Sequence, residues 1–134
     1  CKPYEVKNVP YYDGALGDPV PVEKALQLGC DQVVVILTKP EGELRTADKD
    51  EKLAARIRKK YPKAAEKLCQ RAQRYNEGVS AAQKYVRQGK ALILSPDDTC
   101  GVSTLKKDRT SLQRLYDKGY ADGKKISDFL LAIK

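Results

Sequence analysis

The stretch that decides the fold is residues 12–40, which read YDGALGDPVPVEKALQLGCDQVVVILTKP. An aspartate stands there in a turn at Asp13-Gly14, Asp18 precedes a helix start, and an apolar run extends from Gln32 to Thr38. A continuous run of this length predicts a strand that is buried on both faces, as in a parallel sheet covered by helices. We therefore predict an α/β protein, in which the loop after Thr38 leaves the edge where open α/β sheets bind ligands.

Turn and cap signals divide the rest of the chain into short strands and amphipathic helices. Gly29 and Gly89 are expected to end two helices in the left-handed conformation. Gly119 and Gly123, four residues apart in a polar segment, predict a close approach of the last helix to a neighbour. We expect strands at about 4–6, 9–12, 32–38 and 91–94, with a turn at 7–8, and helices at about 22–28, 48–61, 63–88 and 109–133.

The composition favours anionic partners and contains no bilayer-spanning segment. The formal net charge is +8, and the longest apolar run, residues 33–37, is far shorter than the roughly 20 residues that cross a bilayer. We therefore expect a cytoplasmic protein, with peripheral contact to an anionic membrane surface as one use of the charge. Nucleic acid is disfavoured as a partner because the basic residues are spread over several helices without an aromatic stacking platform.

The residues that usually bind metals are scarce. The sequence has no histidine, and its cysteines at positions 1, 30, 69 and 100 show no Cys-x-x-Cys spacing. We predict neither a metal site nor a cofactor. Cys30 and Cys69 lie among apolar residues and are expected to fill the core.

Asp13 is the candidate catalytic residue. A carboxylate within hydrogen-bond reach of a serine can accept its proton, and Gly14 would allow a tight turn and leave space for a substrate. The dipeptide also favours an ordinary turn, so a purely structural role for Asp13 is the alternative. The 134 residues contain no Gly-x-Ser-x-Gly motif, because the segments around Ser80 and Ser103 lack the second glycine.

Residues 12–40 resemble the C-terminal part of bacterial patatin-like phospholipases. In that family an Asp-Gly-Gly or Asp-Gly-Ala motif carries the aspartate of a Ser–Asp dyad, and Tyr12-Asp13-Gly14-Ala15 is similar to it. The resemblance continues through weaker blocks, which are similar to an accessory helical extension in one bacterial subgroup. These blocks are residues 75–77, 96–98, 100–102 and 115–120.

The resemblance implies that Asp13 is the dyad aspartate, Gly14 its motif glycine and Ala15 an accepted variant of the third position. It implies the C-terminal part of a three-layer α/β/α fold with an appended helical region. Residues 1–47 would end the catalytic core, and residues 48–134 would form a mostly helical extension with one short strand. The serine and a glycine-rich oxyanion loop would lie in an N-terminal half of the same protein, and the absence of methionine also suggests a fragment.

The implied function is that of a serine acyl hydrolase that acts on phospholipids or related lipid esters, with this chain inactive on its own. Lys39 and Arg45, in the loop after the apolar strand, are candidate contacts for phosphate or carboxylate groups, and ordinary solvated charges are the alternative. A non-catalytic module that docks on anionic lipid or on a protein partner is a second function that stays open. A small basic nucleic-acid binder is the third.

Overall fold

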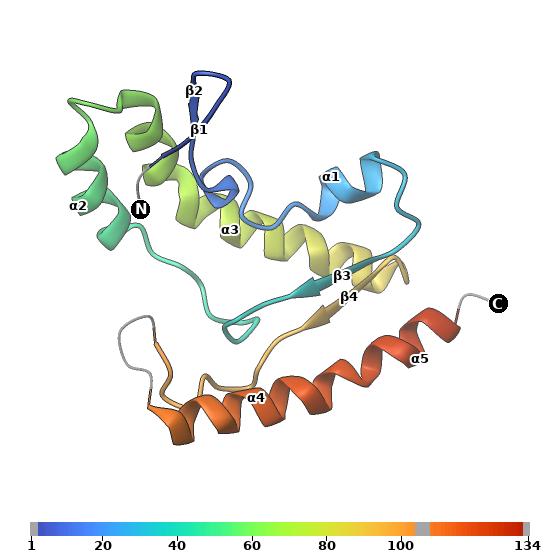
Figure 1. The fold of residues 1–134 in the computed structure, drawn as a ribbon. Coiled ribbons are helices and arrows are strands. Elements are labelled where there is room, and N and C mark those ends of the chain that lie inside the picture. The colour runs from blue at the N-terminus through green and yellow to red at the C-terminus, as the bar shows by residue number, and fades with distance from the viewer. Residues whose placement is uncertain (1–2, 104–107, 133–134) are drawn as a thin grey trace. The chain divides into compact units, whose positions relative to one another are not determined.

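The computed structural model describes residues 3–103 and 108–132 of the chain, so predictions that concern Cys1 and Ile133 lie outside the described residues. The structure is mixed α/β, with 53% helix and 11% strand, and helices therefore provide most of the packing surfaces. The elements in chain order (Figure 1) are β1 Tyr4–Val6, β2 Val9–Tyr11, η1 Gly14–Leu16, α1 Val22–Gln27, β3 Val33–Ile36, α2 Asp48–Ile57, α3 Pro62–Arg87, β4 Ala91–Leu94, α4 Arg109–Gly123 and α5 Lys125–Leu131.

The chain divides into two compact units. The first comprises Cys1–Pro21 and Leu44–Ser80, and the second comprises Val22–Glu43 and Ala81–Lys134. The division falls within α3, so this long helix contributes its N-terminal part to the first unit and its last turns to the second.

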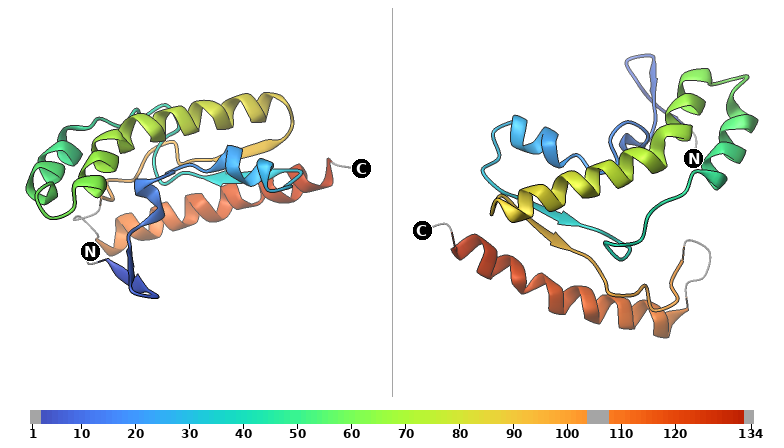
Figure 2. Two further views of the ribbon diagram at one scale, coloured as in Figure 1. Left: turned by 90° about the horizontal axis from the view of Figure 1, so that it is seen from above. Right: turned by 180° about the vertical axis from the view of Figure 1, so that it is seen from behind.

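The first unit begins with an antiparallel hairpin in which Tyr4 pairs with Tyr11 and Val6 with Val9. The predicted turn at Lys7-Asn8 is confirmed, and its φ values of 49° and 63° are those of the two-residue turn that matches strand twist. All six strand residues are exposed. Figure 2 shows the hairpin projecting away from α2 and α3.

The core of the first unit lies where α2 packs on the first half of α3. Ala54 of α2 and Ala65 and Leu68 of α3 are buried together, and Leu16 of η1 packs against them. This cluster is small, because two of its three buried side chains are those of alanines. Cys69 packs against this cluster as predicted, whereas Cys30 is exposed, so its assignment as a core residue is wrong.

The second unit contains a two-stranded parallel sheet in which Val33 pairs with Ala91 and Ile36 with Leu94. The parallel pairing agrees with the sequence pattern, but burial on both faces is wrong, because Val33–Val35 are only half-buried and Ile36 is 70% exposed. The physical reason is that, among the described residues, β3 has β4 as its only neighbouring strand. Gly29 and Gly89 do end α1 and α3, with φ values of 95° and 70°.

The C-terminal helix differs from the prediction in two ways. A single helix was expected here. The structure instead has two, because the regular helical backbone is interrupted at Lys124, so that α4 ends at Gly123 and α5 begins at Lys125. The close helix approach expected at Gly119 and Gly123 is also wrong, since a Cβ atom built on either glycine would meet nothing within 4 Å. Figures 1 and 2 show α4 and α5 following one another along the β3–β4 pair. Within residues 3–103 and 108–132, none of the helices has the length and apolar content needed to cross a membrane.

Candidate functional site

Asp13 follows strand β2 and caps the short helix η1. Its Oδ1 atom accepts a hydrogen bond of 2.8 Å from the backbone N–H of Ala15. The side chain is exposed, and its Oδ2 atom has no partner among the residues that the structure describes. One oxygen therefore orients the carboxylate and the other is open to a further group.

Three contacts within the first unit hold this turn on α3. The Arg74 guanidinium donates a hydrogen bond of 2.6 Å to the carbonyl oxygen of Gly17, immediately after η1. Leu16 packs on the buried alanines described above. At Gly78 the backbone of α3 lies so near Val20 that an added Cβ would be 2.8 Å from the Val20 Cβ. The sequence therefore places Asp13 on a braced segment rather than on a free loop.

Gly14 and Ala15 lie with Asp13 in the same turn, as their adjacency in the sequence requires. Gly14 is exposed, and an added Cβ would meet nothing within 4 Å. This leaves room directly beside the carboxylate.

Lys39 and Arg45, the predicted anion contacts, belong to different units and have different surroundings. Lys39 is half-buried and forms an ion pair with Glu43 on the same loop. The Arg45 guanidinium stacks on the Tyr75 ring, 3.7 Å from its centroid, and its backbone N–H and C=O bond to the Asn76 side chain at 2.9 and 3.0 Å. Lys39 thus already has a carboxylate partner, which weakens its case as an anion contact, whereas the Arg45 guanidinium has a ring contact only and its buried Nε atom has no hydrogen-bond partner among the described residues.

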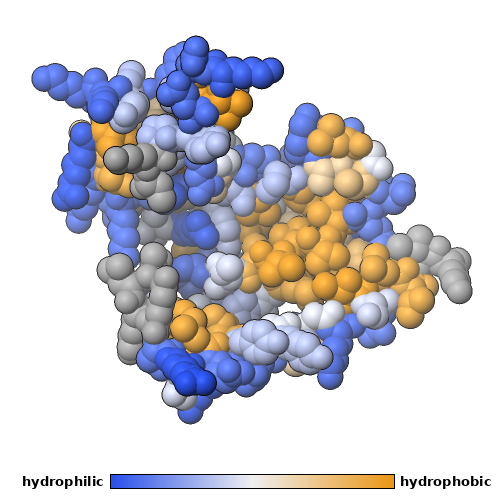
Figure 3. Space-filling model, in the orientation of Figure 1, coloured by the Kyte–Doolittle hydropathy of each residue, from blue (hydrophilic) through white to orange (hydrophobic). Residues whose placement is uncertain are grey.

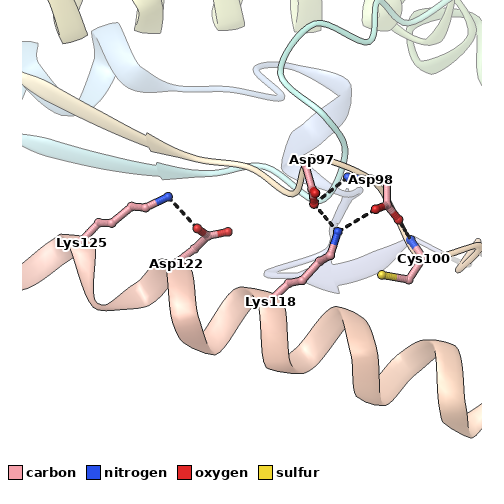
Figure 4. Close-up of polar contacts among 6 residues, drawn as sticks. All are labelled: Asp97, Asp98, Cys100, Lys118, Asp122 and Lys125. Carbon is pink, nitrogen blue, oxygen red and sulfur yellow. Dashed lines mark hydrogen bonds and ion pairs between the residues drawn. The ribbon is translucent and has the colours of Figure 1, made fainter.

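The carboxyl end of the parallel strand β4 carries an acidic pair that sequence reasoning did not assign a role (Figure 4). Asp97 and Asp98 both form ion pairs with Lys118 of α4, and the Lys118 Nζ to Asp98 Oδ2 distance is 2.6 Å. The backbone N–H of Cys100 donates a further hydrogen bond to Asp98. Lys118 is 20 residues from Asp98, so no local pattern could have joined them.

These contacts shift the acid–base equilibria of the cluster. The hydrogen bond from Lys118, followed by those from Cys100, lowers the pKa of Asp98 from 3.8 to about 2. The pKa of Asp97 is lowered by the same lysine, and the pKa of Lys118 is raised, first by its hydrogen bond to Asp97 and then by that to Asp98. All three groups therefore remain charged near neutral pH. The cluster thus forms an ion-pair contact between α4 and the loop after β4, and it does not act as a proton donor or acceptor.

Two clefts open at this edge of the second unit. A polar cleft of about 480 Å³ includes Asp97 and Lys118 together with Lys125, which pairs with Asp122 at 2.7 Å. An apolar groove of about 250 Å³ lies beside Ile36 and Leu94, and its other wall is formed by Leu115, Gly119 and Ile126. Figure 3 shows a broad hydrophobic area over β3, β4 and α1.

The chemical capacity of these regions differs. The polar cleft has its lysines already paired with carboxylates, and no group of three potential metal ligands occurs within the described part of the chain. The apolar groove has few polar atoms with which to orient a reacting group. Asp13 is exposed, lies on a braced turn and has one carboxylate oxygen without a hydrogen-bond partner among the described residues.

The chain belongs to the family described as Domain of unknown function (DUF6363), which matches residues 61–132. The match extends from the start of α3 to the end of α5, and it does not include Asp13. Comparison with curated proteins gave no match, and neither did comparison with solved structures.

Proposed function

We propose that this chain forms part of a Ser–Asp acyl hydrolase similar to the patatin-like phospholipases, acting on phospholipids or related lipid esters, and that Asp13 is the dyad aspartate. The proposal requires an N-terminal half of the same protein that supplies the serine and the oxyanion donors. It also includes the finer fold assignment, in which residues 1–47 end a three-layer α/β/α core and residues 48–134 form a helical extension. The resemblance of residues 12–40 to that family is its basis in the sequence.

The proposal rests on the hydrogen bonding of the Asp13 carboxylate, of which one oxygen has a partner and the other is open. A residue that serves only a turn needs a single acceptor, which Oδ1 provides for the Ala15 N–H at 2.8 Å. The open Oδ2 beside Gly14 is what a general base needs, because a serine hydroxyl must reach it within about 3 Å. The contacts of Arg74, Leu16 and Val20 with the rest of the unit would then fix the direction of the carboxylate.

Two further features support a larger fold around these elements. The hairpin β1–β2 exposes Tyr4, Val6, Val9 and Tyr11, which are residue types that prefer a packed sheet. Among the described residues, strand β3 has one neighbouring strand, and its Ile36 side chain is exposed. Both features are expected if the strands continue a sheet to which an N-terminal half contributes.

In the proposed reaction the Asp13 carboxylate accepts the proton of the serine hydroxyl as the serine oxygen attacks the ester carbonyl. The protonated Asp13 then donates this proton to the departing oxygen, so that the alcohol part of the ester leaves and an acyl-enzyme forms. Water attacks the acyl-enzyme as the Asp13 carboxylate accepts a proton from it, and Asp13 returns that proton to the serine oxygen as the fatty acid is released and the serine is regenerated. The chain itself supplies the carboxylate and the braced turn.

The test compares Asp13→Asn with Asp13→Ala in the full-length protein. Asparagine keeps an oxygen acceptor for the Ala15 N–H and is as good a helix cap as aspartate, but it cannot take a proton. We expect Asp13→Asn to lower kcat for a lipid ester by at least about 100-fold at nearly unchanged thermal stability. Asp13→Ala should lose the same activity and also some stability.

Asp31→Asn is the matched control, because Asp31 is also exposed and the substitution changes charge in the same way. It should leave kcat unchanged. If Asp13→Asn hydrolyses the ester as well as the unmodified protein, Asp13 is a turn residue and the hydrolase proposal is wrong.

A further inference from the structure

The corner between α2 and α3 is the most strongly basic surface of the first unit. From Lys52 to Ala65 the sequence has six basic residues and no acidic one. All six basic side chains are exposed, and within the described part of the chain none of them forms an ion pair. The six are Lys52, Arg56, Arg58, Lys59, Lys60 and Lys63, which we call the basic corner.

The basic corner is not needed for the core of its unit. In α2 the side chains that pack inward are Asp50, Ala54 and Ile57, and these lie on one face at helical spacing. Lys52, Arg56 and Lys59, spaced four and three residues apart, lie on another face of this helix and its C-terminal turn. Because the core already uses the inner face, the outer face is available to a partner.

Apolar side chains accompany the cations. Leu53 is 46% exposed and follows Lys52 directly, and Tyr61 is 38% exposed beside Lys60. The Lys60 ammonium lies 5.3 Å from the centre of the Tyr61 ring. A surface that combines Lys and Arg with exposed Leu and Tyr fits the boundary between lipid headgroups and acyl chains.

We infer that the basic corner docks on an anionic phospholipid surface. The cations would lie among the headgroup phosphates, and Leu53 and Tyr61 would enter the boundary below them. This inference is independent of the proposed function, because it concerns the first unit's helices and would hold for a catalytic or a non-catalytic protein.

A lipid surface suits the basic corner better than a nucleic acid strand does. Binding of single strands requires several aromatic rings on which successive bases stack, and Tyr61 is the sole aromatic residue between positions 52 and 65. Lys60 already lies over that ring. Leu53 has no role on a nucleic acid, whereas it can insert between lipids.

The test is co-sedimentation of the 134-residue chain with vesicles of equal parts phosphatidylcholine and phosphatidylglycerol, at low salt. Each Lys or Arg close to such a surface raises the partition coefficient about five-fold, so the triple variant Lys52→Gln, Arg56→Gln and Lys59→Gln should bind about 100-fold more weakly. Leu53→Gln should weaken binding while leaving the net charge unchanged. Vesicles of phosphatidylcholine alone should bind neither the unmodified chain nor any of its variants.

The matched control removes three exposed cations elsewhere, with Lys24→Gln, Lys84→Gln and Arg114→Gln. This variant has the same net charge as the first triple variant and should retain most of the binding. Equal losses in the two triple variants would overturn the inference, because they would show that net charge alone drives binding. Absence of binding to the anionic vesicles, or displacement from them by a single-stranded or duplex oligonucleotide, would also overturn it.

Discussion

At Gly78 the backbone of α3 lies close to Val20, in the segment that follows η1. A Cβ built there would lie 2.8 Å from the Val20 Cβ and 3.1 Å from the Val20 carbonyl oxygen, and the carbonyl belongs to backbone that cannot move cheaply. Gly119 of α4 presents the opposite situation, because its Cβ would meet nothing within 4 Å. The two helical glycines therefore provide a matched pair.

We expect Gly78→Ala to destabilise the protein by about 1–3 kcal/mol, since the cost of overpacking exceeds the gain in helix propensity. Gly119→Ala should stabilise it by about 0.5–1 kcal/mol, because only the propensity changes. Urea denaturation followed by circular dichroism measures both. A stabilised Gly78→Ala variant would show that α3 does not contact Val20 as described.

Asp98 gives a pH-dependent prediction. Its pKa of about 2 in the fold lies below the ordinary 3.8, so its contact with Lys118 stabilises the fold above about pH 4 and is lost as pH falls toward 2. The raised pKa of Lys118 preserves the contact up to at least its ordinary value of 10.5.

An NMR titration of the Asp98 carboxyl carbon tests this contact. The Lys118→Ala variant should return the pKa of Asp98 most of the way to 3.8, because the hydrogen bond from Lys118 is the largest cause of the shift. The Lys125→Ala variant serves as the control and should leave it near 2, because Lys125 pairs with Asp122. A titration of Asp98 near 3.8 in the unmodified protein would contradict the structure.

For single residues, the sequence predicted those backbone features that depend only on residues adjacent in the chain. The turn at Lys7-Asn8 and the helix-ending Gly29 and Gly89 follow from local backbone preferences. The pairing of Lys118 with Asp98 depends on how β4 and α4 pack, so it left no local signal. The exposure of Cys30 was missed for the same reason.

The packing of α2 on α3 depends on one ion pair at the edge of the small alanine core. Asp50 is only 9% exposed, and Arg71 of α3 donates to it twice, with Nε–Oδ2 and Nη2–Oδ1 distances of 2.9 and 2.5 Å. Such a two-point contact satisfies both carboxylate oxygens and fixes the register of the two helices. Removing the arginine would leave a largely buried carboxylate without its cation.

We expect Arg71→Ala to destabilise the docking of α2 by about 2 kcal/mol. Amide hydrogen exchange in α2 is the appropriate measurement, because the two units can differ in stability. The double variant Asp50→Ala with Arg71→Ala should lose less than the sum of the single losses. Unchanged exchange in Arg71→Ala would mean that this pair does not hold α2.

At the element scale, the long helices were predictable because their apolar stripes repeat locally. Leu68, Ala72, Tyr75, Val79 and Ala82 lie at helical spacing in α3 and are all buried. Val86, which continues this spacing and was expected on the same face, is 41% exposed. The exposure of Ile36 was not predictable, because it depends on which neighbours cover the strand, and the division of the last helix at Lys124 left no signal in the apolar pattern. An apolar strand sequence shows that burial of the strand is favoured, but it does not identify the element that covers the strand.

The whole molecule combines packed helices with strands that, within the described residues, each pair with a single other strand. The described residues place β1–β2 and β3–β4 in separate two-stranded sheets, and each exposes apolar side chains. Two strands alone bury too little surface to be stable, so both pairs are expected to gain from further strands or helices. The sequence predicted the mixed α/β class from local patterns. The sequence pattern does not identify which elements cover the exposed apolar side chains of the two strand pairs, because that depends on tertiary packing.

The most direct test of Asp13 as the catalytic base is the kcat of Asp13→Asn for a lipid ester in the full-length protein. Because asparagine preserves the hydrogen bond to the Ala15 N–H, a change in rate reports on proton transfer rather than on the turn. We expect a fall of at least about 100-fold, with the Asp31→Asn control unaffected. Unaltered hydrolysis by Asp13→Asn would contradict it and leave Asp13 as a helix cap.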